Sequence, residues 1–253
     1  MSPRRRTLRR PDRPQGPPGA GARAGSAGAA RSAPAAGARG GSEAALRRDV
    51  VEICRRLHDR DLIGAAEGNV SVRLGADRFL VTPSGANKAR LRPADLVVVD
   101  GQGATVRGSG RASTELRMHL AAYAARADAG AVVHAHPITA VAFTVAGVPP
   151  PDDLVPEAAV TLGPIAVAPF ATPGTDEVPR SLAPLLARHD VFLLERHGAL
   201  ALGRTLGEAF DRMETLERVA RVALAARLLG RCSPLPADVV EKVLAAAGRP
   251  ARR

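Results

Sequence analysis

Two histidines one residue apart follow an apolar run: His134 and His136, in the segment Ala-Val-Val-His-Ala-His-Pro. Successive side chains of an extended strand alternate between faces, so both imidazoles would lie on the same side of the chain. A third histidine, His197, lies between two further apolar runs and precedes Gly198, which permits close approach of the backbone. Three neutral imidazoles with one open position are a ligand set of catalytic zinc. The spacing therefore predicts a metal site made of His134, His136 and His197.

The other histidines have a simpler interpretation. A lone histidine is more often a hydrogen-bonded structural residue than a ligand, and we expect this role for His58, His119 and His189. A His-x-His pair, taken alone, is as compatible with a structural role as with metal binding. The segments around the histidines must decide between the two interpretations.

Glu115 lies in Ser-Thr-Glu-Leu-Arg, at the predicted start of a helix. The helix dipole would hold a carboxylate ionised there. As a capping residue Glu115 would need no function. As a functional residue it would fill the fourth position of zinc at rest and act as a base when substrate displaces it. The sequence leaves both interpretations open.

Three polar segments could together bind a phosphate group. They are Glu67–Ser71, Thr82–Gly85 and the pair Ser113 and Thr114. Backbone N–H groups at tight turns and at a helix N-terminus, aided by hydroxyls, bind phosphate dianions without any lysine. Each segment alone is merely a turn or a cap, so the prediction depends on all three meeting.

The elements that must position these residues follow from periodicity and capping signals. Ser42 is a plausible N-cap, and the turn at 75–77 is typical of a hairpin. The expected helices span residues 42–64, 113–126, 177–188 and 206–224, with another starting at Pro137, and the expected strands span 70–74, 79–82, 96–99, 131–133, 165–168, 191–194 and 199–202. This mixture indicates an α/β or α+β fold without an internal repeat.

Composition and charge bound the remaining possibilities. The chain of 253 residues is 45% apolar and has no run long enough to span a bilayer, so we expect one domain over residues 42–253 and no membrane association. Residues 1–41 hold nine arginines and one acid, which is most of the net charge of +11. This tail, poor in large apolar side chains, is expected to be disordered.

A nucleic-acid-binding function is not favoured by this composition. Most of the positive charge lies in the tail, tryptophan is absent and Tyr123 is the only tyrosine, so few aromatic side chains could stack on bases. Two distant cysteines, Cys54 and Cys232, form no disulfide framework and suit a reducing cytoplasm. We therefore expect a cytoplasmic protein in which both cysteines have a packing role.

Six motifs in order carry a resemblance to a known family: Gly-Asn-Val-Ser, Thr-Pro-Ser-Gly, Ser-Thr-Glu, His-Ala-His-Pro, Ala-Pro-Phe-Ala-Thr-Pro-Gly-Thr and Arg-His-Gly-Ala. Over roughly residues 44–231 the chain resembles class II aldolase/adducin domains. The resemblance implies a three-layer α/β/α fold around a mixed, mostly antiparallel central sheet. It also implies a homotetramer with sites near subunit interfaces.

The resemblance assigns roles to individual residues. His134, His136 and His197 match the zinc ligands of the family, and Glu115 matches its acid/base residue, which would also be a ligand at rest. The matches to the phosphate-binding loops are Gly68, Asn69, Ser84, Gly85, Ser113 and Thr114. The implied activity is that of a zinc-dependent aldehyde-lyase. It would cleave a small ketose phosphate, such as L-fuculose 1-phosphate, to dihydroxyacetone phosphate and an aldehyde.

One departure from the family pattern affects the reaction. The aldolases have a catalytic tyrosine after the His-x-His segment, whereas the corresponding stretch Leu154–Ala158 has none. Glu157 could replace it as the acid, or be an ordinary loop carboxylate. Epimerases, dehydratases and decarboxylases of sugar phosphates resemble the chain in the same metal motif and remain alternatives. A non-catalytic adducin-like interaction domain is another, although here all three histidines are present.

Overall fold

A computed structural model describes residues 42–249, and the tail expected to be disordered lies outside them. The centre of the fold is an eight-stranded sheet in the order β4-β3-β2-β1-β5-β8-β7-β6. Its strands are β1 Asn69–Gly75, β2 Arg78–Val81, β3 Val97–Val99, β4 Thr105–Arg107, β5 Ala131–Ala135, β6 Ile165–Ala168, β7 Val191–Leu194 and β8 Gly198–Gly203. Only β6 and β7 pair in parallel. The prediction of a mixed, mostly antiparallel sheet is confirmed.

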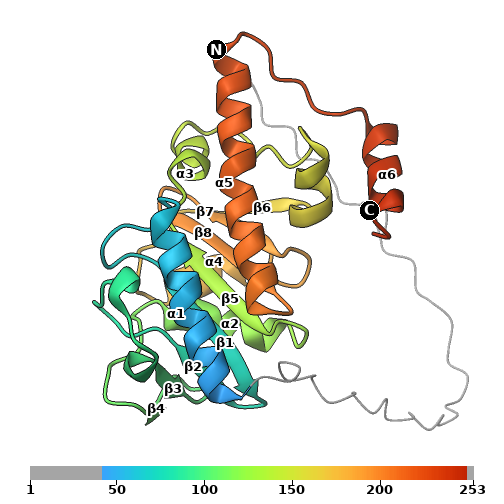
Figure 1. Cartoon of the computed structure of the whole chain (residues 1–253). Coiled ribbons are helices and arrows are strands. Elements are labelled where there is room, and N and C mark those ends of the chain that lie inside the picture. Colours follow the sequence, from blue (N-terminus) through green and yellow to red (C-terminus); the bar gives the residue numbers. More distant parts are fainter. Residues whose placement is uncertain (1–41, 250–253) are drawn as a thin grey trace, which may run out of the picture. The chain divides into compact units, whose positions relative to one another are not determined.

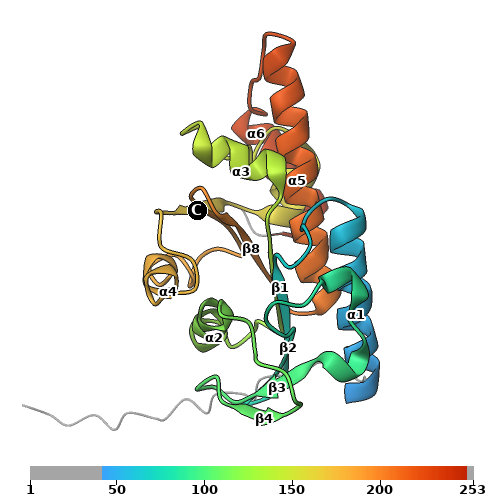
Figure 2. The ribbon, with the colours of Figure 1, turned by 90° about the vertical axis from the view of Figure 1, so that its left-hand side faces the viewer.

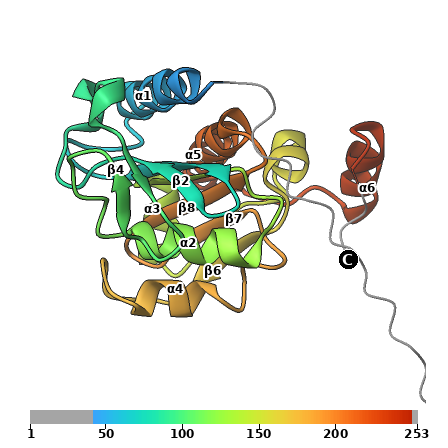
Figure 3. The same cartoon turned by 90° about the horizontal axis from the view of Figure 1, so that it is seen from below.

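Helices cover both faces of this sheet (Figure 1). They are α1 Glu43–Asp59, α2 Leu116–Ala125, α3 Ile138–Val145, α4 Glu177–Leu182, α5 Leu206–Leu228 and α6 Ala237–Ala246, with short helical turns η1 Lys88–Arg90, η2 Pro93–Asp95 and η3 Ala158–Leu162. Figures 2 and 3 show α1 and α5 on one face and α2 and α4 on the other. The three-layer α/β/α architecture is therefore confirmed.

Alternating side chains of the strands divide the apolar core into two layers. Val70 and Val72 of β1 pack in the cluster that includes α1 and α5, whereas Val81 of β2 and Val132 of β5 pack in the cluster on the α2 and α4 side. Burying one apolar face against each helical layer is what stabilises such a sheet. Among residues 42–249, no helix has both the length and the apolar character needed to cross a bilayer.

The predicted hairpin, the N-cap and most of the other elements are confirmed. Ser42 accepts a hydrogen bond from the N–H of Ala45, as an N-cap does. Helix α1 ends at Asp59, earlier than predicted, because Asp61 adopts a positive φ of 55° that a helix cannot continue through. Helix α4 likewise ends at Leu182 rather than near residue 188.

The turns η1 and η2 were not predicted, and neither were three further elements. Strand β4 is exposed along its whole length and shows no apolar alternation, so the periodicity gave no signal for it. Helix α6 and the turn η3 pack against each other, with Val240 and Leu244 buried beside Ala159. The turn η3, with five residues, is too short to show a clear period, whereas α6 carries Val239, Val240, Val243 and Leu244 at helical spacing and was nevertheless not predicted.

Candidate metal centre

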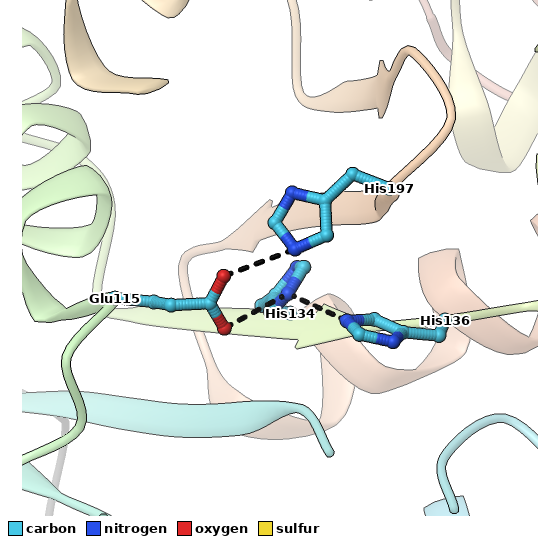
Figure 4. Close-up of side chains that lie close together, drawn as sticks. All are labelled: Glu115, His134, His136 and His197. Carbon is cyan, nitrogen blue, oxygen red and sulfur yellow. Dashed lines mark hydrogen bonds and ion pairs between the residues drawn. The ribbon is translucent and has the colours of Figure 1, made fainter. Parts of the chain in front are cut away.

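The three predicted histidines come together at one end of the sheet (Figure 4). His134 is the penultimate residue of β5, and His136 follows the strand directly. His197 lies in the tight turn between β7 and β8. Because β8 pairs with β5, placing Ala199 opposite Ala135, this turn carries the third imidazole to the other two. The helix expected to begin with Pro137 begins at Ile138, with Pro137 as its N-cap.

The nitrogen and oxygen atoms of four side chains converge on one point. Nε2 of His134 lies 3.1 Å from Nε2 of His136 and 3.3 Å from Oε2 of Glu115. Nε2 of His197 lies 3.0 Å from Oε1 of Glu115. One ligand atom from each residue lies within 4.8 Å of all the others. The four side chains are therefore close enough to share a single ion.

The geometry fits a bound divalent metal better than a closed hydrogen-bond network. Oε1 of Glu115 is buried and has no hydrogen-bond partner, although it lies 3.0 Å from the ring of His197. Nδ1 of His134 lies 2.9 Å from the carbonyl oxygen of Ala199, which accepts its proton and leaves the Nε2 lone pair free. A set of three imidazoles and one carboxylate is typical of a transition-metal site.

The pKa shifts in the cluster agree with this arrangement. Burial alone would raise the pKa of Glu115, but the contacts with His134 and His197 outweigh it and hold the pKa far below its ordinary value. Burial, reinforced by the other two imidazoles, lowers the pKa of His136 to about 4. Glu115 is thus ionised and His136 neutral at physiological pH, which are the states that bind a cation.

Gly198 is required where the two strands approach. A Cβ at this position would lie 2.6 Å from the carbonyl oxygen of Ala135, 2.8 Å from Cδ2 of His136 and 2.9 Å from Cε1 of His134. Any larger residue would push the imidazoles apart. The expected close approach at this glycine is therefore confirmed.

Glu115 does not act as a helix cap. It occupies the N-cap position of α2, one residue before the helix, and its side chain makes no capping hydrogen bond. Nδ2 of Asn69 instead donates to Oε2 of Glu115 at 2.9 Å. Asn69 lies directly across from His134 in the β1–β5 pair. The capping interpretation is therefore not supported, and the functional role of Glu115 stays a prediction.

Sequence reasoning missed two groups that surround the histidines. Oε2 of Glu67 lies 3.7 Å from Nδ1 of His136 and also accepts a hydrogen bond from the N–H of Gly64. The carbonyl of Ala199 orients His134. The motif that contains Glu67 was singled out for its glycine and asparagine. Only the short distance from Glu67 to His136 in the structure shows that this carboxylate lies beside the histidines.

The three segments predicted to bind phosphate adjoin one another. The N–H of Thr82 donates to the carbonyl oxygen of Val70. Because Val70 directly follows Gly68 and Asn69 in the chain, this bond joins the first segment to the second. The N–H of Ser84 donates to the carbonyl oxygen of Arg111 at 2.8 Å, and an isolated β-bridge between Pro83 and Ala112 joins these two segments. This bridge carries Ser84 and Gly85 towards Ser113 and Thr114, and Ser84, Gly85 and Thr114 are exposed. Phosphate binding by these residues stays a prediction.

The remaining histidines lie outside the cluster. His58 is on α1, where it pairs with Asp59, and His189 bonds to the carbonyl oxygen of Pro164. His119 is buried one turn along α2 from Glu115, and its Nδ1 lies 2.7 Å from Oγ of Ser71. These placements agree with the structural roles that the sequence suggested.

The single tyrosine of the chain cannot serve as an acid at this site. Tyr123 is buried on α2, its hydroxyl bonds to Ser71 and its ring stacks on Phe79. Burial raises its pKa well above the ordinary value. Glu157, the alternative acid, is exposed at the N-cap of η3.

Comparison with known proteins identifies the family. Residues 48–224 match the model of the class II aldolase and adducin N-terminal domain. The chain is 35% identical over 204 residues to the 5-methylthioribulose-1-phosphate/5-deoxyribulose-1-phosphate aldolase of Rhodospirillum rubrum, covering 81% of this chain and 91% of that protein. It is 34% identical over 185 residues to the 3-oxo-tetronate 4-phosphate decarboxylase of Cupriavidus necator, covering 72% and 84%.

A solved structure is similar to this chain in both fold and sequence. The L-fuculose-1-phosphate aldolase of Thermus thermophilus superposes with a TM-score of 0.67 at 35% sequence identity, covering 76% of this chain and 98% of that one. The match of the family model spans most of the chain and includes all four residues of the cluster. The chain therefore belongs to the class II aldolase and adducin family, as an enzyme of the class II aldolase type.

Proposed function

We propose that the chain is a zinc-dependent aldolase that cleaves a ketose 1-phosphate to dihydroxyacetone phosphate and an aldehyde. The observation that carries this proposal is the convergence of three imidazoles and Glu115 beside the adjoining glycine segments. Two of the similar proteins are named as aldolases of ketose 1-phosphates. Zinc suits this ligand set, and its presence would be checked by elemental analysis of the purified protein.

The histidines would hold the metal and Glu115 would move a proton. When bound, the metal supplies Lewis acidity to the carbonyl and an adjacent hydroxyl of the substrate. The bond between C3 and C4 breaks, its electron pair stays with C3, and the hydroxyl on C4 loses its proton as the aldehyde forms. The ionised carboxylate of Glu115, oriented by Asn69, is placed to accept a proton and deliver it to C3.

The phosphate group would bind at the joined turns. Gly68 and Gly85 have positive φ angles of 65° and 69°, which turn successive backbone N–H groups towards a common side. Asn69, Ser84, Ser113 and Thr114 would add side-chain donors. The exposure of Ser84, Gly85 and Thr114 supports this role, because a substrate can reach them.

A decarboxylase acting on a sugar-acid phosphate is the second candidate. One observation favours it specifically: the chain has no tyrosine at the cluster to act on the oxygen of the aldehyde. Loss of carbon dioxide leaves an electron pair on the same kind of carbon and needs no such group. A similar protein at 34% identity carries this name.

One experiment separates the two candidates. Metal-loaded and chelator-treated protein would be assayed in parallel for triose phosphate release from L-fuculose 1-phosphate and from 5-deoxyribulose 1-phosphate, and for carbon dioxide release from 3-oxo-tetronate 4-phosphate. Aldol cleavage that disappears with the chelator and returns with zinc supports the proposal. Metal-dependent carbon dioxide release without aldol cleavage would replace it by the decarboxylase.

The assembly expected from the family resemblance stays a prediction. A homotetramer would be checked by sedimentation of the full chain, with the metal-loaded and metal-free forms compared. The cytoplasmic location also stays a prediction, to be checked by fractionation of the source cells.

A further inference from the structure

The chain uses lysine at only two positions. Of its 36 Lys and Arg residues, all but Lys88 and Lys242 are arginines. Lys242 is exposed on α6 and pairs with Asp238, as surface lysines commonly do. Lys88 is 2% exposed and opens the turn η1, six residues after Thr82 of the second polar segment. A buried lysine in so arginine-rich a chain indicates a position where a compact ammonium is needed.

Lys88 joins two of the loops assigned to phosphate. Its Nζ donates to the carbonyl oxygen of Ala86 at 2.8 Å and to that of Ala66 at 3.1 Å. Its backbone N–H points at the carbonyl of Ala65, at 3.4 Å. Ala66 lies two residues before Gly68, and Ala86 directly follows Gly85. One side chain therefore fixes the spacing of the loops 64–69 and 82–87, which we call the glycine loops.

Lys88 forms no ion pair with any residue that the structure describes. Within residues 42–249, no carboxylate lies within ion-pair distance of its Nζ, and the two carbonyls satisfy two of its three N–H donors. The neighbouring thiol of Cys54 stays neutral, because burial raises its pKa to about 12. Burial lowers the pKa of Lys88, while the charge of Glu115 acts to raise it. An ammonium buried without a counterion is unfavourable unless an anion binds beside it.

We propose that Lys88 is the cation of the phosphate site, a positioning residue that holds the glycine loops together and whose charge balances a bound phosphate dianion. This inference rests on the proposed function for its substrate, but anion binding can be tested without turnover. It revises the expectation from the sequence that backbone N–H groups and hydroxyls alone would suffice. If this assignment is correct, the protein binds phosphorylated ligands more tightly than unphosphorylated ones, and this preference is lost when Lys88 is replaced.

The first test measures the binding of inorganic phosphate by calorimetry to the full-length, metal-loaded protein. Lys88→Met should weaken phosphate binding by about tenfold or more, since it removes a charge-assisted contact. Lys242→Met removes the same charge from the surface and should leave the affinity unchanged. Equal affinity in wild type and Lys88→Met would overturn the proposal. Neither result depends on which sugar phosphate is the substrate.

Kinetics then distinguish a cation from a merely structural residue. For the substrate that the wild type cleaves, Lys88→Met should raise KM by a similar factor and change kcat little. Activity on the same ketose without its phosphate should be unaffected. Equal losses on both substrates would show a structural role and overturn the proposal. Absence of wild-type turnover would refute the proposed function, leaving the phosphate titration to decide on Lys88.

A second measurement uses the wild-type protein and therefore remains possible even if Lys88→Met does not fold. Wild-type protein labelled with isotopes only in its lysine side chains gives two sets of side-chain NMR signals, which Lys242→Arg assigns. Added phosphate should shift the Lys88 signal and leave the Lys242 signal in place. A Lys88 signal that does not move at phosphate concentrations that saturate the calorimetric titration would overturn the proposal.

Discussion

The two ends of the central strands carry different arrangements of charged and polar side chains. At the end where β5 finishes and β8 begins, Glu115 faces His134, His136 and His197. At the opposite end, ion pairs join side chains that lie next to the starts of β5 and β7. These side chains are Arg126, Asp128, Asp190, Glu208 and Arg212.

The two ends differ in how many of their charged and polar atoms have an ion-pair or hydrogen-bond partner. One carboxylate oxygen of Asp190 lies 2.9 Å from a guanidinium nitrogen of Arg126, and the other lies 2.8 Å from one of Arg212. Positive and negative groups therefore alternate. At the histidine end, an oxygen of Glu115 has no hydrogen-bond partner and the imidazole nitrogens face one another. Matched ion pairs stabilise a fold, whereas converging acceptors need a cation. The comparison therefore separates a structural cluster from a functional one.

Removal of a histidine should have the largest effect. His136→Ala should abolish stoichiometric metal binding and lower turnover by at least about 10³-fold, more than the loss expected for a residue outside the ligand set. Elemental analysis and the aldolase assay would measure both. His58→Ala, on the surface of α1, is the matched control and should behave as wild type. Full metal content in His136→Ala would contradict the assigned ligand set.

Glu115→Gln should reduce turnover while sparing the metal. Loss of a general base lowers rates by about 10²–10⁴-fold, and the three imidazoles would still hold the ion. Turnover and metal content would be compared with those of Asn69→Ala, which removes only the hydrogen bond that orients Glu115 and should have a smaller effect. Metal loss as complete as in His136→Ala would show that Glu115 acts mainly as a ligand.

At the opposite end, Arg212→Met should affect stability and not catalysis. Arg212 is 5% exposed, and its removal leaves Asp190 and Glu208 with fewer partners. Breaking a buried pair costs about 3 kcal/mol of unfolding free energy, measured by denaturant titration. The exposed pair of Arg117 with Asp176 is the control, where Arg117→Met should cost about 1 kcal/mol or less. A large loss of kcat in folded Arg212→Met would remove the distinction between the two ends.

The pH dependence of Asp128 gives the smallest effect. The hydrogen bond from Arg126 lowers the pKa of Asp128 below its ordinary value of 3.8. A depressed carboxyl pKa contributes stability that is present above the ordinary value and lost as pH falls through the folded-state value. Asp128→Asn should therefore be slightly less stable than wild type at neutral pH. The difference in unfolding free energy should shrink below pH 3.8, and a difference independent of pH would contradict this assignment.

Much of the candidate site could be predicted because its signals are local. His134 and His136 share a face through the two-residue period of a strand, and Gly198 stands out in the sequence directly after His197. The atoms that Gly198 approaches belong to residues 134–136, which the pairing of β8 with β5 brings to it. Strand β4 was missed because its three residues are too few to show a period. Helix α6 is as long as the predicted helix α2 and carries Val239, Val240, Val243 and Leu244 at helical spacing, so its signal was present in the sequence although it was not predicted. The ends of α1 and α4 were misplaced because backbone turns, rather than sequence patterns, stop them.

The sequence by itself indicated a mixture of helices and strands, one strand face for His134 and His136, and the order of the glycine segments, since periodicity and motif order are properties of neighbouring residues. The three-layer fold was an expectation from the family resemblance of the six motifs. Only the tertiary structure decided that Glu115 turns from the helix end to the imidazoles, that Asn69 holds it there and that Lys88 joins the two loops. It also decided that Arg212 meets Asp190 rather than solvent. These contacts join residues far apart in the chain, and they exist because the sheet brings separate strands side by side.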